Sequence, residues 1–242
     1  MGAQWKQKWR ELAADQKGRV TGKLVREIQV AAKLGGPNPD LNARLAAAVA
    51  NAKKQSVTKD TIERAIAKGS GTGSDAVVYD TVVFEGFAPH QVPVIVECLT
   101  DNNNRTSSEV KVIFRDASAT LGGKGSVGWM FEHCGMIEAG HPMANHDHEI
   151  AALEAEADDA ELMEAEDENA PGTHARFFCQ ASNLDAVTKA LKAAGWTVTT
   201  SELSYRAKNY PELTDVQRGE VTAFLQELDA HDDVHRVHAA LK

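Results

Sequence analysis

The sequence lacks any apolar run near the roughly 20 residues that cross a bilayer, so we expect no membrane partner. It has only three cysteines, Cys98, Cys134 and Cys179, which are scattered and odd in number. That usage is typical of reduced thiols in a cytosol and excludes a disulfide scaffold. The basic N-terminus has no apolar core after it, so it does not read as a secretory signal. We therefore expect a cytoplasmic protein.

Positive charge is in short supply and unevenly placed. The 242 residues carry a formal charge of −9, from 26 Lys and Arg against 35 Asp and Glu. Residues 1–75 nevertheless hold 14 Lys and Arg and 7 Asp and Glu, a net of +7, which leaves −16 for the remainder. Such an asymmetry predicts a basic module that meets a polyanion and an acidic remainder that does not.

The first 75 residues are predicted to be helical. Residues 21–36 place Leu24, Val25, Ile28 and Ala32 on one face, and a Gly pair stops the helix. The next helix is expected to begin at Pro39, with Asn38 as its N-cap and Leu41 on its apolar face.

A third helix is expected to start with Thr58 as its cap and to end at Gly69. Val57 before the cap can pack on Ile62 as a hydrophobic staple. The stretch 70–75 then predicts a flexible linker.

The pattern changes to strands after the linker. Residues 77–87 and 92–100 predict a hairpin, residues 103–117 a helix with polar cap residues before it, and 120–133 a Gly-broken strand. An amphipathic stretch near 215–230 and an alternating one near 234–241 supply a last helix and strand. The residues between them predict a second unit, with strands at 136–140, 174–181 and 196–205, a short strand near Leu162, and helices at 148–160 and 183–195.

These elements predict a multidomain α+β protein, with an N-terminal helical bundle and two ferredoxin-like α+β modules, the third inserted into the second. We expect a basic helical domain at 1–75, a discontinuous α+β domain at 76–133 and 206–242, and an inserted acidic α+β domain at 134–205.

Several blocks resemble the YebC family: KLVREIQVAAKLGG, KDTIERAIAKG, YDTVVFEGFAPHQVPVIVECLTDNNNRT and GGKGSVGWMFE. The resemblance covers most of the chain and implies a three-domain cytosolic protein. Members are described as probable DNA-binding transcriptional regulators; mitochondrial relatives activate translation of cytochrome c oxidase, and bacterial ones are seen as ribosome-associated factors that relieve stalling. None is known as an enzyme. Two stretches depart from the family pattern: GAQWKQKWRE stands for GHSKWANIKHRK, and the hairpin loop GFAPHQ for GYGPGG.

The basic module carries the candidate nucleic-acid contacts. Its cations can neutralise phosphates, and Trp5, with Trp9, can stack on unpaired bases. The candidate contact residues are Trp5, Lys6, Lys8, Arg10, Lys17, Arg19, Lys23, Arg26, Lys53, Lys54, Lys59, Arg64 and Lys68. Alternatively, the tryptophans pack on the module's own helices and the lysines only solvate a face. Residues 41–69 can also form a helix-turn-helix. No side chain there is clearly suited to contact base edges, so we expect non-specific or shape-based recognition.

A second candidate site lies in the turn TDNNNRT. Asp101, Asn102, Asn104 and Arg105 open a helix there and form a possible anion or partner site, or simply a capped turn. The stretch GGKGS does not meet the phosphate-loop motif, and its glycines are better explained by a broken strand or a close backbone approach.

The histidines fit no standard zinc spacing, although His133, Cys134, His141, His146 and His148 lie close in sequence. We predict no catalytic residue, no metal site and no cofactor. The expected function is a nucleic-acid-binding regulator of gene expression. Two versions stay open, a DNA-binding transcriptional regulator and a ribosome-associated translation factor on ribosomal RNA. A metal- or phosphate-dependent enzyme is the alternative from another class, and the oligomeric state is left open.

Overall fold

The computed structural model describes residues 4–71, 79–163 and 172–241, without the side chains of residues 4–16 and Ala43. The chain forms two compact units. The first joins Met1–Met130 to Asn209–Lys242, and the second is Phe131–Lys208, inserted into the first. The division into three domains, with the boundaries given above, stays a prediction.

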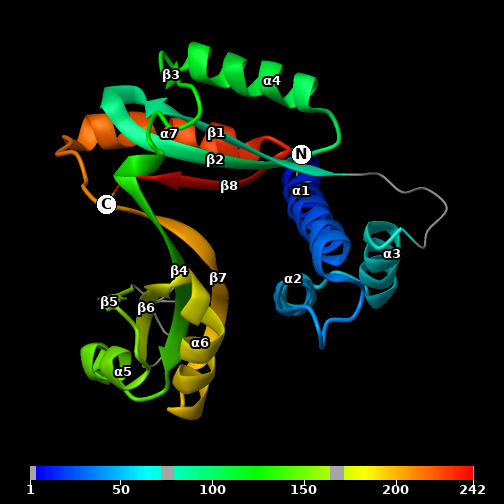
Figure 1. Cartoon of the computed structure of the whole chain (residues 1–242). Helices are drawn as coiled ribbons and strands as arrows, with labels where there is room; N and C mark the ends of the chain where they lie inside the picture. Colours follow the sequence, from blue (N-terminus) through cyan, green and yellow to red (C-terminus); the bar gives the residue numbers. More distant parts are fainter. Residues whose placement is uncertain (1–3, 72–78, 164–171, 242) are drawn as a thin grey trace. The chain divides into compact units, whose positions relative to one another are not determined.

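Three helices open the first unit (Figure 1): α1 (Gln4–Gly35), α2 (Ala43–Lys54) and α3 (Lys59–Gly69). Their apolar faces meet in one core, as the helical spacing predicted. Ile28 and Ala32 of α1 are buried in it, with Leu24 and Val25 partly buried beside them. The core is formed by Ile28, Ala31, Ala32, Leu45, Ala48, Val49, Ala52, Val57, Ile62 and Ala65.

The start of α2 was predicted wrongly. Its N-cap is Asn42, not Asn38, and Asn38 instead lies in the turn that leads to the helix. Asn42 is buried, its Oδ1 accepts from Leu45 N at 3.1 Å, and its Nδ2 donates to two carbonyl oxygens of the α1 end. One amide therefore satisfies backbone groups of two helices, which Asn38 cannot do from the turn. Leu41 precedes the helix and is 84% exposed, so its place on the apolar face was also wrong.

The third helix matches its prediction. Thr58 is the N-cap, and its hydroxyl accepts from the backbone N–H of Thr61. Val57 and Ile62 are both buried in the helical core, and α3 ends at Gly69. The linker predicted for 70–75 lies mostly outside the described residues.

The α+β part of the first unit is an antiparallel sheet in the order β3-β1-β2-β8. Its strands are β1 (Asp80–Ala88), β2 (Val92–Thr100), β3 (Thr120–Leu121) and β8 (Val234–Ala239). Two helices pack on this sheet, α4 (Asn103–Asp116) and α7 (Asp215–Ala230), and Figure 1 shows both alongside it. Phe114 of α4 and Phe224 of α7 meet edge to face, with ring centroids 5.0 Å apart. The predicted hairpin is confirmed, and the late helix and strand complete the sheet.

The hairpin turn η1 (Pro89–Gln91) docks on α7. His90 Nε2 lies 2.5 Å from Glu220 Oε2. His90 and Gln91 both have positive φ, 62° and 59°, a conformation that favours glycine. The departure of this loop from the glycine-rich family pattern is thus accompanied by a hydrogen bond between the loop and α7 of the same chain.

The strand predicted for 120–133 is broken at its glycines, as the sequence indicated, and the break is long. β3 has two residues, a loop and the single turn η2 (Gly128–Met130) follow, and β4 begins at Phe131. The loop departs from strand geometry because its backbone N–H groups converge on the carboxylate of Glu85 in β1, as described below.

The second unit is another antiparallel four-stranded sheet, in the order β5-β6-β4-β7. Its strands and helices are β4 (Phe131–His141), α5 (His148–Glu154), β5 (Asp159–Leu162), β6 (Thr173–Gln180), η3 (Ala181–Asn183), α6 (Leu184–Ala193) and β7 (Thr197–Ala207). Ile137, Phe177, Leu191 and Trp196 are buried in its core. The helix predicted for 148–160 ends earlier, because Glu156 takes a left-handed φ of 57°.

Candidate nucleic-acid interface

Helices α2 and α3 present four of the thirteen predicted contact residues to solvent. Lys53 and Lys54 lie in the last turn of α2, and Lys59 and Arg64 lie on α3; all four are exposed. Lys68, one turn further along α3, is half-buried. Because a short turn joins the two helices and they pack on one core, their cations are held on one rigid support.

Two of these cations form local ion pairs. Lys59 Nζ lies 3.6 Å from Glu63 Oε1, and Arg64 NH2 lies 2.6 Å from Asp60 Oδ2. Both pairs join residues four apart on an exposed helix face, where such a pair contributes only about 0.3–0.5 kcal/mol. A phosphate group can therefore replace either carboxylate at little cost.

Helix α1 carries the other predicted contact residues, and those whose side chains the structure describes differ in exposure. Lys17 and Arg19 are exposed on it. Trp5, Lys6, Lys8 and Arg10 also lie within this helix, but their side chains are outside the described part of the chain.

Lys23 and Arg26 are used for contacts within the chain. Lys23 Nζ lies 2.8 Å from Asp229 Oδ1 and also donates to the Asp229 carbonyl oxygen. Arg26 donates to the carbonyl oxygen of Asp232 and lies 3.5 Å from Asp233 Oδ1. The two side chains are only 17% and 22% exposed. These two cations therefore join α1 to the last turn of α7 and to the turn after it, and their contact with nucleic acid stays a prediction.

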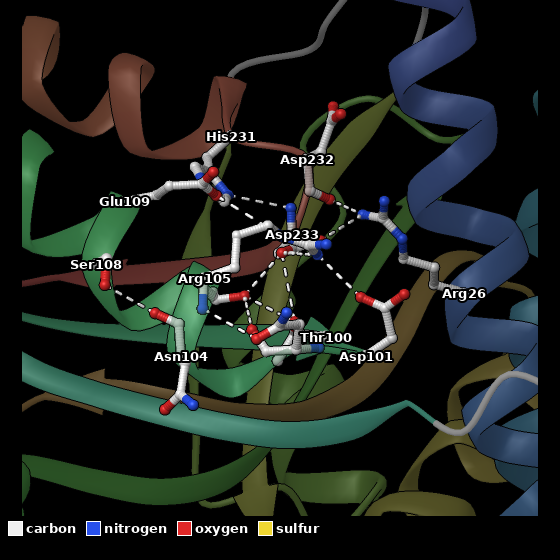
Figure 2. Close-up of polar contacts among 12 residues, drawn as sticks. Arg26, Thr100, Asp101, Asn104, Arg105, Ser108, Glu109, His231, Asp232 and Asp233 are labelled. Atoms are coloured by element: carbon white, nitrogen blue, oxygen red, sulfur yellow. Dashed lines mark hydrogen bonds and ion pairs between the residues drawn. The ribbon is translucent and has the colours of Figure 1, made fainter.

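The TDNNNRT turn forms a polar network around Asp233 (Figure 2). Arg105 NH2 donates to Asp233 Oδ2 at 2.8 Å and to Asp101 Oδ1 at 2.9 Å. Thr106 Oγ1 donates to the same Asp233 oxygen at 2.7 Å. Asp233 is 3% exposed, and burial raises its pKa, but the hydrogen bonds from Arg105 and Thr106 outweigh burial and leave the pKa lowered. Asp233 is thus held as a buried anion.

Structural side-chain contacts in this turn therefore engage three of the four residues of the possible anion site, Asp101, Asn102 and Arg105. Asn102 is the N-cap of α4, since its side chain accepts from Arg105 N at 3.1 Å. The Asn104 carbonyl oxygen accepts from Ser108 Oγ at 2.8 Å. The charge of Arg105 is compensated by Asp101 and Asp233, and their hydrogen bonds raise its pKa. The turn fastens the start of α4 to the start of β8.

Three side chains next to this network have metal-ligating atoms close together. Glu109, His231 and Asp233 place one such atom each within 4.8 Å of one another. His231 Nε2 already lies 3.0 Å from Glu109 Oε2, and His231 Nδ1 accepts from the Asp233 backbone N–H at 3.1 Å. With both ring nitrogens engaged and the Asp233 carboxylate bound by Arg105, these residues fit a hydrogen-bonded network better than a cation.

The histidine cluster noted in the sequence is only partly assembled by the fold. His141 and His146 stack ring on ring, with centroids 3.8 Å apart, and both lie against Trp196. They pack at the end of β4 as an aromatic group.

Sequence reasoning missed a buried ionic group in the helical part. Glu27 of α1 is buried, Arg44 Nε donates to its Oε1 at 2.9 Å, and His235 Nε2 lies 2.9 Å from its Oε2. Burial raises the pKa of Glu27, but His235 and Arg44 more than offset this, and the pKa is lowered. The only signal in the sequence is one glutamate among apolar residues of a helix, which does not reveal its partners.

The glycine loop holds an anion, but that anion is a side chain of the same protein. The backbone N–H groups of Gly125, Val127 and Gly128 donate to the Glu85 carboxylate at 2.7, 2.9 and 2.7 Å. Burial raises the pKa of Glu85, but these three donors and the nearby charge of Lys124 outweigh burial and lower it. These three hydrogen bonds therefore attach the glycine loop to β1.

None of the helices in the described part of the chain is long and apolar enough to cross a membrane.

Comparison with known proteins finds relatives that match the chain along its whole length. Residues 3–72 match the family described as "TACO1/YebC protein N-terminal domain", and residues 79–241 match "TACO1/YebC second and third domain". A relative from Pseudomonas syringae pv. syringae is 49% identical, covering 100% of this chain and 99% of its own, and one from Bdellovibrio bacteriovorus is 48% identical over 100% of both. Both carry the name "Probable transcriptional regulatory protein". A conserved hypothetical protein of known crystal structure from Aquifex aeolicus is 32% identical with a TM-score of 0.82, covering 94% of this chain and 90% of its own. The chain belongs to the TACO1/YebC family.

Proposed function

We propose that this protein is a non-enzymatic regulator of gene expression that binds nucleic acid through the exposed cations of its helical part. The observation that carries the proposal is the group of exposed basic side chains on α2 and α3, on a module with a net charge of +7 in a protein of net charge −9. The names of the relatives from Pseudomonas and Bdellovibrio support the same role.

The chemistry of this surface favours the phosphate backbone over base sequence. Lysine and arginine neutralise phosphates and release counterions, a gain that depends on salt and not on sequence. The local pairs Lys59–Glu63 and Arg64–Asp60 are weak, so they do not prevent a phosphate from replacing either carboxylate. Recognition is therefore expected to depend on backbone charge and shape.

Charge reversal on α3 tests the proposal. The triple variant K59E/R64E/K68E should bind a fluorescent duplex at least about tenfold more weakly, and the slope of log affinity against log salt should flatten by about 2–3. Fluorescence anisotropy measures both quantities. The matched control K111E/K189E/K192E makes the same charge change at exposed lysines of α4 and α6 and should bind much more like the wild type. Equal binding by the triple variant and the wild type would move the contact surface elsewhere.

The kind of nucleic acid is decided by a separate experiment. A pulldown with the full chain is treated with DNase or with RNase, and the co-purified nucleic acid is sequenced. Loss of the bound material on DNase treatment supports a transcriptional regulator. Recovery of ribosomal RNA that is lost on RNase treatment supports a ribosome-associated translation factor.

A further inference from the structure

The loop between β3 and β4 is held rigidly at its base, although half of it is glycine. Three backbone N–H groups bind the Glu85 carboxylate, and the Gly122 N–H donates to the Glu85 carbonyl oxygen at 2.8 Å. Both the side chain and the backbone of one β1 residue thus hold this loop, residues 122–129. A loop held in this way can present side chains in one orientation without a large entropy cost on binding.

An exposed tryptophan stands at the end of this loop. Trp129 is 66% exposed, and its Nε1 donates to the carbonyl oxygen of Ser126 at 3.2 Å. The hydrogen bond orients the indole against the loop and leaves much of the ring in solvent. Tryptophan is rarely placed this way in a core-forming role, because its large apolar surface gains from burial.

A cation and an unexplained glycine lie in the same loop. Lys124 is exposed, and because its charge acts on the Glu85 carboxylate, Lys124 lies close to that carboxylate. At Gly123 an added Cβ would meet nothing within 4 Å, and its φ is not in the left-handed region. By contrast, a Cβ at Gly122 would lie 2.3 Å from Ser126 Oγ, and Gly125 has a φ of 86°. The fold therefore explains Gly122 and Gly125 but gives no internal reason for glycine at 123.

We propose that residues 122–129 form a second nucleic-acid contact, in which Trp129 stacks on an unpaired base and Lys124 binds the adjacent phosphate. The inference rests on the proposed function and adds a single-stranded segment to its substrate. Every base offers a π-face, so stacking on tryptophan tolerates sequence, as the helical surface does. The backbone N–H groups already bind the Glu85 carboxylate, and the exposed Lys124 is the one cation among residues 122–129, so it can complement a phosphate. A bare backbone at Gly123 lets the strand approach closely.

Two oligonucleotides separate stacking from charge. The first is an oligothymidylate about 12 nucleotides long, and the second is the same phosphate chain with every base removed. Trp129→Ala should weaken binding of the first roughly 5- to 150-fold and leave binding of the second within about twofold. Trp129→Phe, which keeps a ring, should recover most of the loss. Gly123→Val should also weaken binding about fivefold or more while the thermal unfolding temperature stays unchanged, because the fold has room for the side chain.

The outcomes distinguish this inference from the proposed function. If the wild type binds neither oligonucleotide nor a duplex, the proposed function fails. If it binds and K59E/R64E/K68E weakens binding, but Trp129→Ala leaves the oligothymidylate affinity unchanged, only the loop contact is overturned. Equal losses by Trp129→Ala on both oligonucleotides, or a Trp129→Phe variant as weak as Trp129→Ala, would also overturn stacking. Leu41→Ala, at an exposed apolar side chain on the helical part, serves as the matched control and should bind like the wild type.

Discussion

The buried carboxylate of Asp233 should be one of the most sensitive single positions for stability. It receives two short hydrogen bonds, from Arg105 and Thr106, and an ion pair from Arg26 at 3.5 Å. Asp233→Asn keeps the shape of the side chain and removes its charge. The amide also turns one acceptor into a donor, which then faces groups that are themselves donors.

The size of the effect follows from these contacts. A hydrogen bond to a charged group contributes about 1.5–3 kcal/mol, and breaking a buried ion pair costs about 3–5 kcal/mol. The Arg105 side chain is 43% exposed and keeps Asp101 and water as partners, which reduces the loss. We therefore expect Asp233→Asn to lower the free energy of unfolding by about 2–3 kcal/mol, from the lower part of these ranges.

Urea denaturation followed by circular dichroism at several pH values is the assay. The pKa of Asp233 is lowered in the folded state, so its stabilisation is fully present above the unfolded value of about 3.9 and is lost as pH falls through the folded pKa. The difference between wild type and Asp233→Asn should hence be constant near neutral pH and shrink in acid.

Asp232→Asn is the control for this experiment. The neighbouring Asp232 meets Arg26 through its carbonyl oxygen, which the substitution leaves in place, so the change should stay within about 0.5 kcal/mol. A loss below about 0.5 kcal/mol in Asp233→Asn, or one that does not shrink in acid, would refute the assignment of Asp233 as a buried anion that holds this turn.

Two further predictions concern the joints that the fold revealed. Asn42→Ala should lower the free energy of unfolding by about 2–3 kcal/mol, because it leaves buried backbone groups of α1 and α2 unpaired. The control Asn38→Ala should lower it by less than about 0.5 kcal/mol in urea denaturation. Equal losses in the two variants would argue against Asn42 as the cap. Glu85→Ala should speed hydrogen exchange at the backbone amides that its carboxylate binds, while amides of β2 keep their protection; unaltered exchange would show that the loop holds its shape without this carboxylate. The amides to follow are Gly125, Val127 and Gly128.

Much of the secondary structure could be predicted because its signals are local. The burial of Ile28 and Ala32 follows from helical spacing, and the β1–β2 hairpin follows from two apolar runs and a short turn. Thr58 was recognised as a cap because it stands directly before the apolar pattern of α3. The choice between Asn38 and Asn42 failed because both have cap chemistry, and the deciding contacts come from the end of another helix.

The anion that the glycine loop binds could not be predicted for a similar reason. Its composition excluded a phosphate-loop motif, yet its N–H groups do bind an anion, since Glu85 lies about forty residues earlier in the chain and reaches it only through the pairing of β1 with β3. Likewise, nothing local reveals that Glu27 will meet His235, whose strand is the last of the chain.

The amino-acid order alone determined the family, the α+β class and the gathering of cations in the first 75 residues, because composition and periodicity act over short stretches. Which cations remain available was decided only in three dimensions. Lys23 and Arg26 have the same chemistry as Lys59 and Arg64. The fold brings the carboxylates of Asp229 and Asp233, more than 200 residues away, against the first pair and leaves the second pair on an open helix face. A charge acts on whatever lies within a few ångströms, and only the folded chain sets that neighbourhood.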